Sequence, residues 1–336
     1  MQTRTIGPFD VTAVGLGCMN LSHAYGEPVS AEQGRELLAH ALDQGVTLFD
    51  TAALYGFGAN ESLVGPVLAP HRARITLCSK GGLAGVVGDD GVKRRVIDGR
   101  PATLRRNCEE SLQRLGTDVI DLYYLHRWDK SVPIEESVGE MGRLLQEGKV
   151  RALGLSEVSV ETLNRAHKEH PITALQSEYS LWSRNAELGT LQRCAELGIA
   201  YVAFSPLGRG FLGGILDVAT LGEKDVRSAM PRFSAENYAR NVRLLAPMRE
   251  IAEQADCSLA TLAIAWVLQQ GEHVIALPGT TQRKHLDEDL RGAQVKLSSA
   301  QLEQLDALFQ PSAIAGSRYA AQGHREVDTE EFTPAA

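Results

Sequence analysis

The 336-residue sequence lacks the features that mark a disulfide framework, a metal site or a secreted chain. Its five cysteines are scattered, odd in number and free of Cys-x-x-Cys spacing, so we expect reduced, mostly buried thiols. The first ten residues, MQTRTIGPFD, have no basic segment followed by an apolar one, which argues against secretion. No apolar run is long enough to span a membrane as a helix. These absences predict a cytosolic protein without a metal site and without a membrane partner.

The chain also lacks an excess of positive charge. Its 42 acidic residues outnumber 34 basic ones, for a formal net charge of -8. This balance disfavours nucleic acids and other polyanions as partners, but it allows a local basic pocket for one phosphorylated cofactor. The apolar fraction of 43% is typical of a globular protein, and the length fits either two domains or one α/β barrel.

Eight short apolar segments are distributed along the chain, most of them continuously apolar, as strands buried on both faces are. These segments are Val11 to Cys18, Val46 to Thr51, Ile75 to Lys80, Ile120 to His126, Arg151 to Ser156, Thr173 to Glu178, Ile199 to Ser205 and His273 to Pro278. Helical patterns lie between them, and this alternation predicts a parallel sheet. Eight such units without a break in composition favour a closed (β/α)₈ TIM barrel over two doubly wound domains. We therefore expect residues 1–336 to form a single domain.

Several helix ends carry recognisable signals. Ser30 and Gln33 form a capping box, Pro133 precedes an acidic first turn, and Gly116 is a helix C-cap signal. The connections 81–101 and 207–233 are long and glycine-containing, so we expect functional or mobile loops there. The tail from about Ala313 is polar and irregular, which predicts a surface strap or a disordered end.

Polar residues terminate the expected strands. Asp50 ends the second strand in LFDTAALYG, Lys80 ends the third and His126 ends the fourth, while Tyr55 follows Asp50 by five positions. Each has an ordinary explanation alone: an N-cap, a solvated strand end, a satisfied core histidine. In a TIM barrel, however, all these strand ends converge on one mouth, where active sites lie.

This set of side chains supports one particular chemistry. A free tyrosine has a pKa of about 10, and a neighbouring lysine ammonium favours the phenolate and lowers that pKa. Asp50 would pair with Lys80 and keep it charged, while His126 would orient a carbonyl or relay its proton. The set is then a general acid for an alkoxide. No side chain supplies a hydride, so a cofactor must.

At these residues the sequence resembles the aldo-keto reductase family. The matching segments, in the family's order from Gly15 to about Ala307, are LFDTAALYG, SK at 79–80, DLYYLHR, RALGLSE, LQSEYSLW, FSPLGRGFLGG and LPGTTQRKHLDE. Within the family, the sequence most resembles the branch of perakine reductase and auxin-induced-like proteins. The resemblance implies NADPH-dependent reduction of a small aldehyde or ketone on a (β/α)₈ barrel. It further implies a hairpin, TRTIGPFDVTAV, that plugs the barrel bottom, and long loops on the C-terminal face.

The resemblance also assigns site residues. Its catalytic tetrad falls on Asp50, Tyr55, Lys80 and His126, with Tyr55 as the proton donor. The implied cofactor contacts are Ser156 and Gln176 at the nicotinamide carboxamide, Phe204 stacked on the nicotinamide, Ser205, Leu207, Arg209 and Gly210 at the pyrophosphate, Gly279 and Thr280 beyond it, and Arg283 and Glu288 at the adenosine end.

Four positions depart from the family pattern. Glu157 stands where many members have Asn, and Gln282 where a basic residue near the 2′-phosphate is common. His285 stands where other branches have Arg, and Asp289 where Asn usually contacts the adenine. The basic neighbours Arg283 and Lys284 could compensate at the phosphate. NADPH is therefore the expected cofactor, with NADH not excluded.

Other motifs have competing interpretations. GRGFLG at 208–213 matches a dinucleotide-binding GxGxxG, but an irregular segment follows where that fold needs a helix and a strand. A loop that closes over a pyrophosphate explains its glycines better. The segment HKEH, with His167 and His170, lacks a third metal ligand and indicates a solvated helix face. Phe57, Trp128 and Trp182 either pack the loops or line the pocket.

Two other functions compete with a carbonyl reductase. A phosphate-binding isomerase on the same barrel would need a glutamate base at a strand end. A cofactor-binding regulatory subunit is the second alternative, because potassium-channel beta subunits resemble this family and keep the tetrad. The chain has no obvious partner-binding extension, and turnover of good aldehydes would separate the two classes. The sequence leaves the particular substrate and the oligomeric state open.

Overall fold

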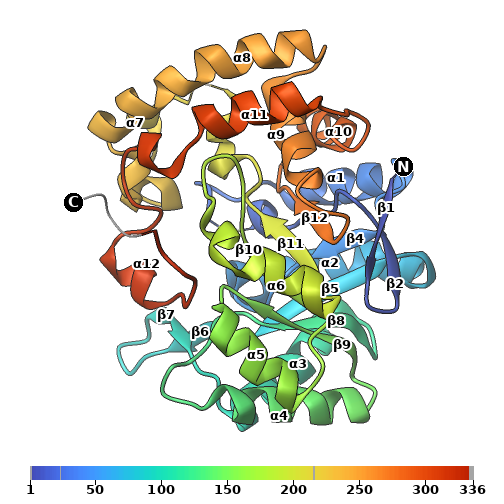
Figure 1. Cartoon of the computed structure of the whole chain (residues 1–336). Coiled ribbons are helices and arrows are strands. Elements are labelled where there is room, and N and C mark those ends of the chain that lie inside the picture. Colours follow the sequence, from blue (N-terminus) through green and yellow to red (C-terminus); the bar gives the residue numbers. More distant parts are fainter. Residues whose placement is uncertain (1, 23, 215, 333–336) are drawn as a thin grey trace.

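The computed structural model describes residues 2–22, 24–214 and 216–332, and its centre is a ring of eight parallel strands (Figure 1). Their order is β12-β11-β10-β9-β8-β5-β4-β3. Their bounds are Leu16–Gly17 for β3, Leu48–Asp50 for β4, Thr76–Gly81 for β5, Ile120–Leu125 for β8, Val150–Ser156 for β9, Ala174–Glu178 for β10, Ala200–Phe204 for β11 and Val274–Leu277 for β12. Each of these strands pairs with the next barrel strand along the chain, as the predicted barrel requires.

Hydrogen bonds between the first and last strands close the ring. The Gly15 N–H donates to the Ala276 carbonyl at 2.9 Å, and the Ala276 N–H donates to the Ala13 carbonyl at 3.0 Å. Val14 and Ala276 also form a parallel bridge. The (β/α)₈ prediction is thus confirmed. The predicted first strand was too long, because Val11 belongs to a separate hairpin and the barrel strand proper begins at Leu16.

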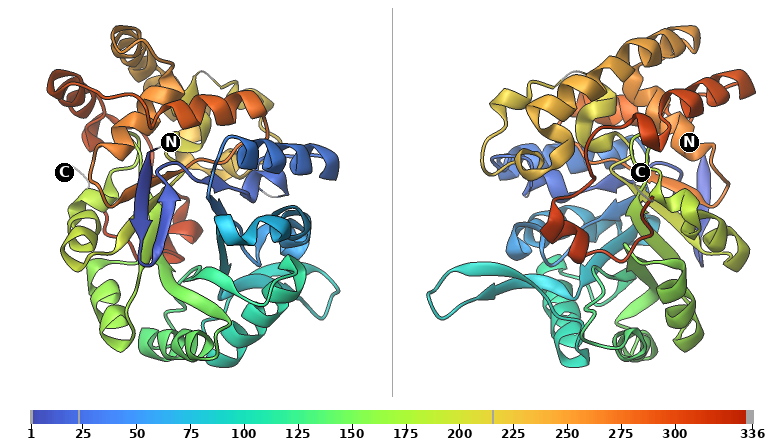
Figure 2. Two further views of the ribbon diagram at one scale, coloured as in Figure 1. Left: turned by 90° about the vertical axis from the view of Figure 1, so that its right-hand side faces the viewer. Right: turned by 60° about the vertical axis from the view of Figure 1, so that its left-hand side comes forward.

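Helices surround the ring and cover its outer face (Figures 1 and 2). Their bounds are Ala31–Asp43 for α1, Ala59–Leu68 for α2, Pro101–Leu115 for α3, Ile134–Gln146 for α4, Val160–Glu169 for α5, Thr190–Leu197 for α6, Ala235–Asn241 for α7, Leu245–Gln254 for α8, Leu259–Leu268 for α9, Arg283–Arg291 for α10, Ser299–Leu308 for α11 and Ala321–Arg325 for α12. The expected signals are present: Ser30 and Gln33 form the capping box of α1, and Gly116 ends α3 with φ of 64°.

An N-terminal hairpin closes the bottom of the barrel. Strands β1 (Thr3–Ile6) and β2 (Phe9–Thr12) pair antiparallel. Ile6 and Val11 are fully buried in one apolar cluster with Leu48, the first residue of β4. The left view of Figure 2 shows this hairpin across the centre of the ring. Because one end is filled, the opposite end, at the carboxyl ends of the strands, is the mouth.

The two long connections differ in structure. The stretch 81–101, expected as a loop, contains an antiparallel hairpin of β6 (Leu83–Val87) and β7 (Lys93–Ile97) that projects from the barrel (Figure 2, right). The sequence did not indicate these strands, because the stretch contains several glycines and charged residues. An exposed two-stranded ribbon also needs no apolar face packed on the core. The stretch 207–233 consists of short 3₁₀ turns, the first of them η5 (Gly208–Gly213).

The C-terminal tail is an ordered strap across the mouth. It contains the short turn η10 (Pro311–Ala313) and helix α12. The carboxylate of Asp328 accepts a hydrogen bond from the Ser159 hydroxyl at 2.9 Å, at the N-terminus of α5. The Val327 carbonyl accepts one from Lys130 at 2.8 Å. Of the two expectations for this segment, the strap is therefore the one found.

Two further expectations concern cysteines and membrane spans. All five cysteines are free, and four of them are buried. Within the described residues, no single helix has the length and apolar character needed to cross a membrane. One pair, 235–254 with 259–268, passes that test only when its two parts, bent by 80°, are taken together.

Candidate active site

A cavity of about 660 Å³ opens at the mouth of the barrel. Most of the residues singled out from the sequence line it: Asp50, Tyr55, His126, Ser156, Gln176, Phe204, Ser205, Leu207, Arg209, Gly210, Gly279, Thr280 and Glu288. Lys80 lies fully buried behind Asp50 and Tyr55, and Arg283 lies outside the lining. Strand ends far apart in the sequence thus meet at one place.

A buried ion pair lies at the base of this cavity. Lys80, on β5, is paired through Nζ with Oδ1 of Asp50, the last residue of the neighbouring strand β4. The same ammonium donates to the Thr51 carbonyl at 3.0 Å, and both paired side chains are at most 4% exposed. Burial lowers the pKa of Lys80, but the Asp50 carboxylate and the Tyr55 hydroxyl together outweigh burial, and the net shift is upward. Lys80 is therefore a cation in this site.

Tyr55 completes the arrangement above the ion pair. Its hydroxyl lies 3.2 Å from Lys80 Nζ, and its ring meets the His126 ring edge-on at 5.7 Å. The chain reverses directly after it, since Gly56 and Phe57 both have positive φ. Burial raises the pKa of Tyr55, and Lys80 offsets only part of that rise. The expected lowering by the lysine is therefore present, but burial, which the sequence does not reveal, has the larger effect on this pKa.

The expected nicotinamide contacts lie beside this group. Ser156 ends β9 and Gln176 is in the middle of β10, where the two residues are register partners. The Gln176 amide donates to Asp50 Oδ2 at 2.9 Å, so the ion pair and the expected carboxamide contact share one hydrogen-bond network. Phe204 ends β11 and also lines the cavity.

The loop after β11 bends sharply around the cavity. Ser205, Arg209 and Gly210 all have positive φ, and the GRGFLG motif forms the 3₁₀ turns of η5. It does not open a helix after a strand, so the alternative of a Rossmann-type site is excluded. At Gly213, an added Cβ would meet no atom within 4 Å, which leaves open space at this side of the cavity.

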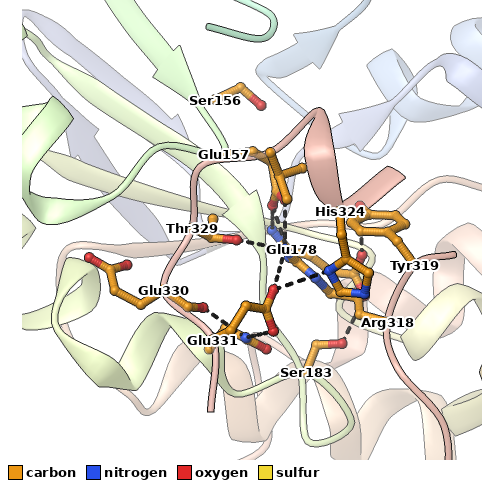
Figure 3. A network of polar contacts seen from close by, with 12 residues as sticks. Ser156, Glu157, Glu178, Ser183, Arg318, Tyr319, His324, Thr329, Glu330 and Glu331 are labelled. Carbon is orange, nitrogen blue, oxygen red and sulfur yellow. Dashed lines mark hydrogen bonds and ion pairs between the residues drawn. The ribbon is translucent and has the colours of Figure 1, made fainter. Parts of the chain in front are cut away.

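Arg209 is held by two neighbours from other parts of the fold. Its Nη2 lies 2.7 Å from Oε2 of Glu178, the last residue of β10, and 3.0 Å from the hydroxyl of Tyr319 in the tail. The same Tyr319 hydroxyl donates to Glu178 at 3.1 Å (Figure 3). Burial alone raises the pKa of Glu178, but the guanidiniums of Arg209 and Arg318 outweigh it and lower that pKa to about 2.

The far end of the cavity is less positive than expected. Arg283 is exposed and forms an ion pair with Glu36 at 3.0 Å. Asp289, by contrast, is 1% exposed, and within the described part of the chain neither of its carboxyl oxygens has a hydrogen-bond partner. Burial raises the pKa of Asp289 well above its ordinary value, and the charge of Glu288 adds to that rise.

Several cavity residues were not assigned from the sequence, and Arg127, Arg95 and Tyr319 are among them. Arg127 donates to the His126 carbonyl at 2.7 Å and to the Ser156 hydroxyl at 3.1 Å. Its position directly after His126 in the sequence was the feature that could have identified it as a cavity residue. Arg95, on β7, is the last of three consecutive basic residues, 93–95. Tyr319 comes from the tail, which has no periodic sequence pattern.

The remaining motifs have structural roles. Trp182 stacks on Phe211 with ring centroids 4.0 Å apart, Trp128 donates to the Val132 carbonyl at 2.9 Å, and neither they nor Phe57 lines the cavity. His167, in α5, accepts a hydrogen bond from the Ile172 N–H in the loop that follows this helix. Among the residues that the structure places, no group of three or more His, Cys, Asp or Glu side chains is arranged to hold a metal ion.

Comparison with known proteins agrees with this geometry. The model of the family described as "Aldo/keto reductase family" matches residues 13–310. The chain belongs to the aldo/keto reductase family. A relative named probable aldo-keto reductase 1, from Glycine max, is 44% identical over 312 residues, which are 93% of this chain and 89% of that protein.

Solved structures of family members superpose on the fold. The glycerol dehydrogenase AKR11B4 from Gluconobacter oxydans has a TM-score of 0.84 at 30% identity, covering 95% of this chain and 99% of that one. The aldo-keto reductase AKR11C1 from Bacillus halodurans, in its holo form, has a TM-score of 0.76 at 25% identity, covering 97% and 100%. The chain is therefore an NAD(P)H-dependent oxidoreductase, and its family implies reduction of carbonyl compounds.

The cavity fits a nicotinamide cofactor. It extends from Tyr55 and His126 at one end to Glu288 and Asp289 at the other. Both polar and apolar side chains line it, and the loop of Arg209 and Gly210 bends around it. Asp289 offers a buried carboxyl group with no hydrogen-bond partner among the described residues.

The depressed pKa of Glu178 predicts acid sensitivity. A carboxyl group whose pKa falls from 4.5 to about 2 on folding adds about 3 kcal/mol to the free energy of unfolding at pH values above 4.5. This contribution is lost as the pH falls toward 2. The difference in unfolding free energy between wild type and Glu178→Gln should therefore be largest near pH 7 and shrink by about that amount near pH 2. Urea unfolding across this range measures it.

The exposed Glu223→Gln variant, with the same change of charge, is the matched control and should show no such window. An equal difference between wild type and Glu178→Gln at pH 7 and pH 3 would contradict the proposed ionisation of Glu178.

Proposed function

We propose that this protein reduces an aldehyde or ketone to the alcohol with NADPH, and that Tyr55 is the general acid. The observation that carries the proposal is the 3.2 Å contact between the Tyr55 hydroxyl and Lys80, whose ammonium is paired with Asp50. A phenol at the mouth of a cavity, backed by a buried cation, is suited to give up a proton to a developing alkoxide.

Each member of the tetrad then has a defined part in the reaction. When bound, NADPH supplies the hydride to the carbonyl carbon. The Tyr55 hydroxyl donates its proton to the carbonyl oxygen, and the negative charge left on the phenolate is stabilised by the Lys80 ammonium. Asp50 keeps Lys80 charged and aimed. His126, whose ring meets that of Tyr55, orients the carbonyl oxygen toward the phenol.

The raised pKa of Tyr55 is compatible with this role. Because burial raises it, the phenol stays protonated at neutral pH and is ready to donate. The acceptor is an alkoxide, which is more basic than a phenolate, so the transfer remains favourable. The 8% exposure of Tyr55 also keeps bulk water from competing for the proton.

The cofactor contacts proposed from the resemblance are consistent with the cavity. Ser156 and Gln176 would hold the carboxamide, Phe204 would stack on the nicotinamide, and the pyrophosphate would lie along Ser205, Leu207, Arg209 and Gly210. Gly279, Thr280, Glu288 and Arg283 would bind the adenosine end. Arg283 pairs with Glu36 while both are more than half exposed, and such a pair is worth under about 1 kcal/mol, so Arg283 can turn to a 2′-phosphate. This supports NADPH over NADH.

An enzyme is favoured over a regulatory subunit or an isomerase. The relatives named above carry the names of a reductase and a dehydrogenase. The carboxylate Glu178 at the end of β10 is engaged by Arg209 and is therefore unsuited to act as the base of an isomerase. A cytosolic location stays a prediction.

Replacing Tyr55 by phenylalanine tests the assignment. The variant keeps the ring against His126 and loses only the hydroxyl, so NADPH binding should be retained while kcat falls by about 10²- to 10⁴-fold. The measurement is NADPH and NADH oxidation over a panel of aldehydes and ketones, with cofactor affinity by fluorescence titration. Turnover by Tyr55→Phe at the wild-type rate would remove Tyr55 from the mechanism, and tight cofactor binding without turnover of any substrate would favour the regulatory subunit.

The charges around the cavity point to an acidic substrate. Four cations there are paired with carboxylates: Lys80 with Asp50, Arg209 with Glu178, Arg227 with Asp225 and Arg95 with Glu326. Arg127 differs, because it donates hydrogen bonds to a carbonyl and a hydroxyl. Within the described residues, no ion pair involves it. Burial lowers the pKa of Arg95, and the like charge of Arg127 lowers it further, so the two guanidiniums lie close enough to interact. Because Arg95 is already paired with Glu326, an anionic group on the substrate would chiefly neutralise Arg127 and so relieve this repulsion.

Matched substrates test this preference. Wild type should show a KM for 4-carboxybenzaldehyde about tenfold below that for benzaldehyde, and Arg95→Gln should lose most of this difference while benzaldehyde turnover stays unchanged. Arg94→Gln is the control, because Arg94 points away from the cavity and pairs with Asp90. Glu326→Gln should strengthen the preference, since Glu326 pairs with Arg95. Equal KM values for the two aldehydes in wild type would refute the anionic substrate.

A further inference from the structure

We propose that the C-terminal tail is part of the cofactor site, with Arg318 and Tyr319 as positioning residues that act through Glu157 and Glu178. The inference rests on the proposed NADPH-dependent function. Both tail residues lie beyond residues 13–310, the part of the chain that the family model matches. Their role is therefore argued from this chain's own contacts (Figure 3).

Glu157 extends the pairing of two strands past their last register partners, Ser156 and Gln176. It has a positive φ of 57°, and its N–H donates to the Gln176 carbonyl at 3.1 Å. Its side-chain Oε1 then accepts a hydrogen bond from the Glu178 N–H at 2.7 Å, in place of a backbone carbonyl. The carboxylate of Glu157 therefore fixes the ends of β9 and β10, where the two proposed carboxamide contacts lie.

Arg318 holds that carboxylate in place. Its Nη2 lies 3.0 Å from Glu157 Oε2 and its Nη1 lies 3.2 Å from Oε1, with the two side chains 2% and 0% exposed. A second contact joins the same segments, because the Asp328 N–H donates to the Glu157 carbonyl at 2.9 Å. A buried carboxylate without a cation is unfavourable, so the position of Glu157 depends on Arg318.

Tyr319 acts on the neighbouring part of the cofactor site, the proposed pyrophosphate contact. Its hydroxyl donates to Glu178 Oε2 at 3.1 Å and accepts from Arg209 at 3.0 Å, and Arg209 itself lies 2.7 Å from the same carboxylate oxygen. Together, the buried Glu178 and the partly buried Tyr319 fix the direction of Arg209, the proposed pyrophosphate contact. Two consecutive tail residues thus position the nicotinamide contacts and the pyrophosphate contact together.

The proposal also accounts for a departure from the family pattern. Many members have Asn at the position of Glu157, but a neutral amide could not pair with the guanidinium of Arg318. In this chain the carboxylate points at the tail, and Ser156 and Gln176 remain as the carboxamide contacts. Glu157 and Arg318 therefore form a matched pair.

The test is the affinity for NADPH, measured by quenching of intrinsic fluorescence in the full chain. Arg318→Gln and Tyr319→Phe should each raise the Kd for NADPH about tenfold, as expected from losing hydrogen bonds to charged groups, and Arg318→Lys should restore part of the affinity. Affinity for adenosine 2′,5′-bisphosphate should stay within twofold of wild type, because this fragment lacks the nicotinamide and the pyrophosphate. Arg325→Gln, an exposed charge change on α12 of the same tail, should alter neither value.

The outcomes separate this inference from the proposed function. If wild type does not bind NADPH, the proposed function fails. If wild type binds NADPH and the folded variants bind it equally well, the tail is only a strap and the inference is overturned. An equal loss for NADPH and for the adenosine fragment also overturns it, because that result means general loosening. If Arg318→Gln does not fold, the NADPH affinity of Tyr319→Phe tests the inference, because this variant removes only one hydroxyl and should still fold.

Discussion

The ion pair between Lys80 and Asp50 is the interaction on which the rest of the site depends. Both groups are buried at the ends of adjacent parallel strands, where desolvation opposes charge. An apolar pair would be no less stable there, so the charges point to a function at this position. Through Lys80 the pair reaches the Tyr55 hydroxyl, and through Asp50 it reaches the Gln176 amide. The proposed acid and a proposed cofactor contact thus share one electrostatic centre.

The barrel allows this centre to exist by closing the bottom of its interior and by holding the elements around its mouth in place. The N-terminal hairpin fills the bottom with Ile6 and Val11, so water does not reach the ion pair from below. Above it, a second layer of buried ion pairs surrounds the mouth, formed by Glu157 with Arg318 and Glu178 with Arg209. These pairs join strand ends, a loop and the tail, so the parts of the mouth that come from distant sequence are held by charge.

The sequence was informative where a physical rule links pattern to position. Continuous apolar segments ended by polar residues located the strands and placed Asp50, Lys80 and His126 at one mouth, since parallel strands end on the same side. The same rule cannot describe residues that belong to no strand. Tyr319 and Arg318 come from a tail without periodicity. The ribbon of β6 and β7 has no alternation of apolar and polar residues, because LAGVV is continuously apolar and KRRVI begins with three basic residues. The net pKa of Tyr55 depends on burial, which no local pattern encodes.

The central claim is that the charge of Lys80 makes Tyr55 an efficient acid, and single-turnover hydride transfer in Lys80→Met tests it most directly. Methionine keeps the length of the side chain and removes its charge. The account predicts that the rate constant of the chemical step falls by about 10²-fold or more while NADPH still binds. Partial recovery in the Asp50→Asn, Lys80→Met double variant would show that the unpaired carboxylate, and not misfolding, causes part of the loss. A rate within threefold of wild type in Lys80→Met would contradict the account.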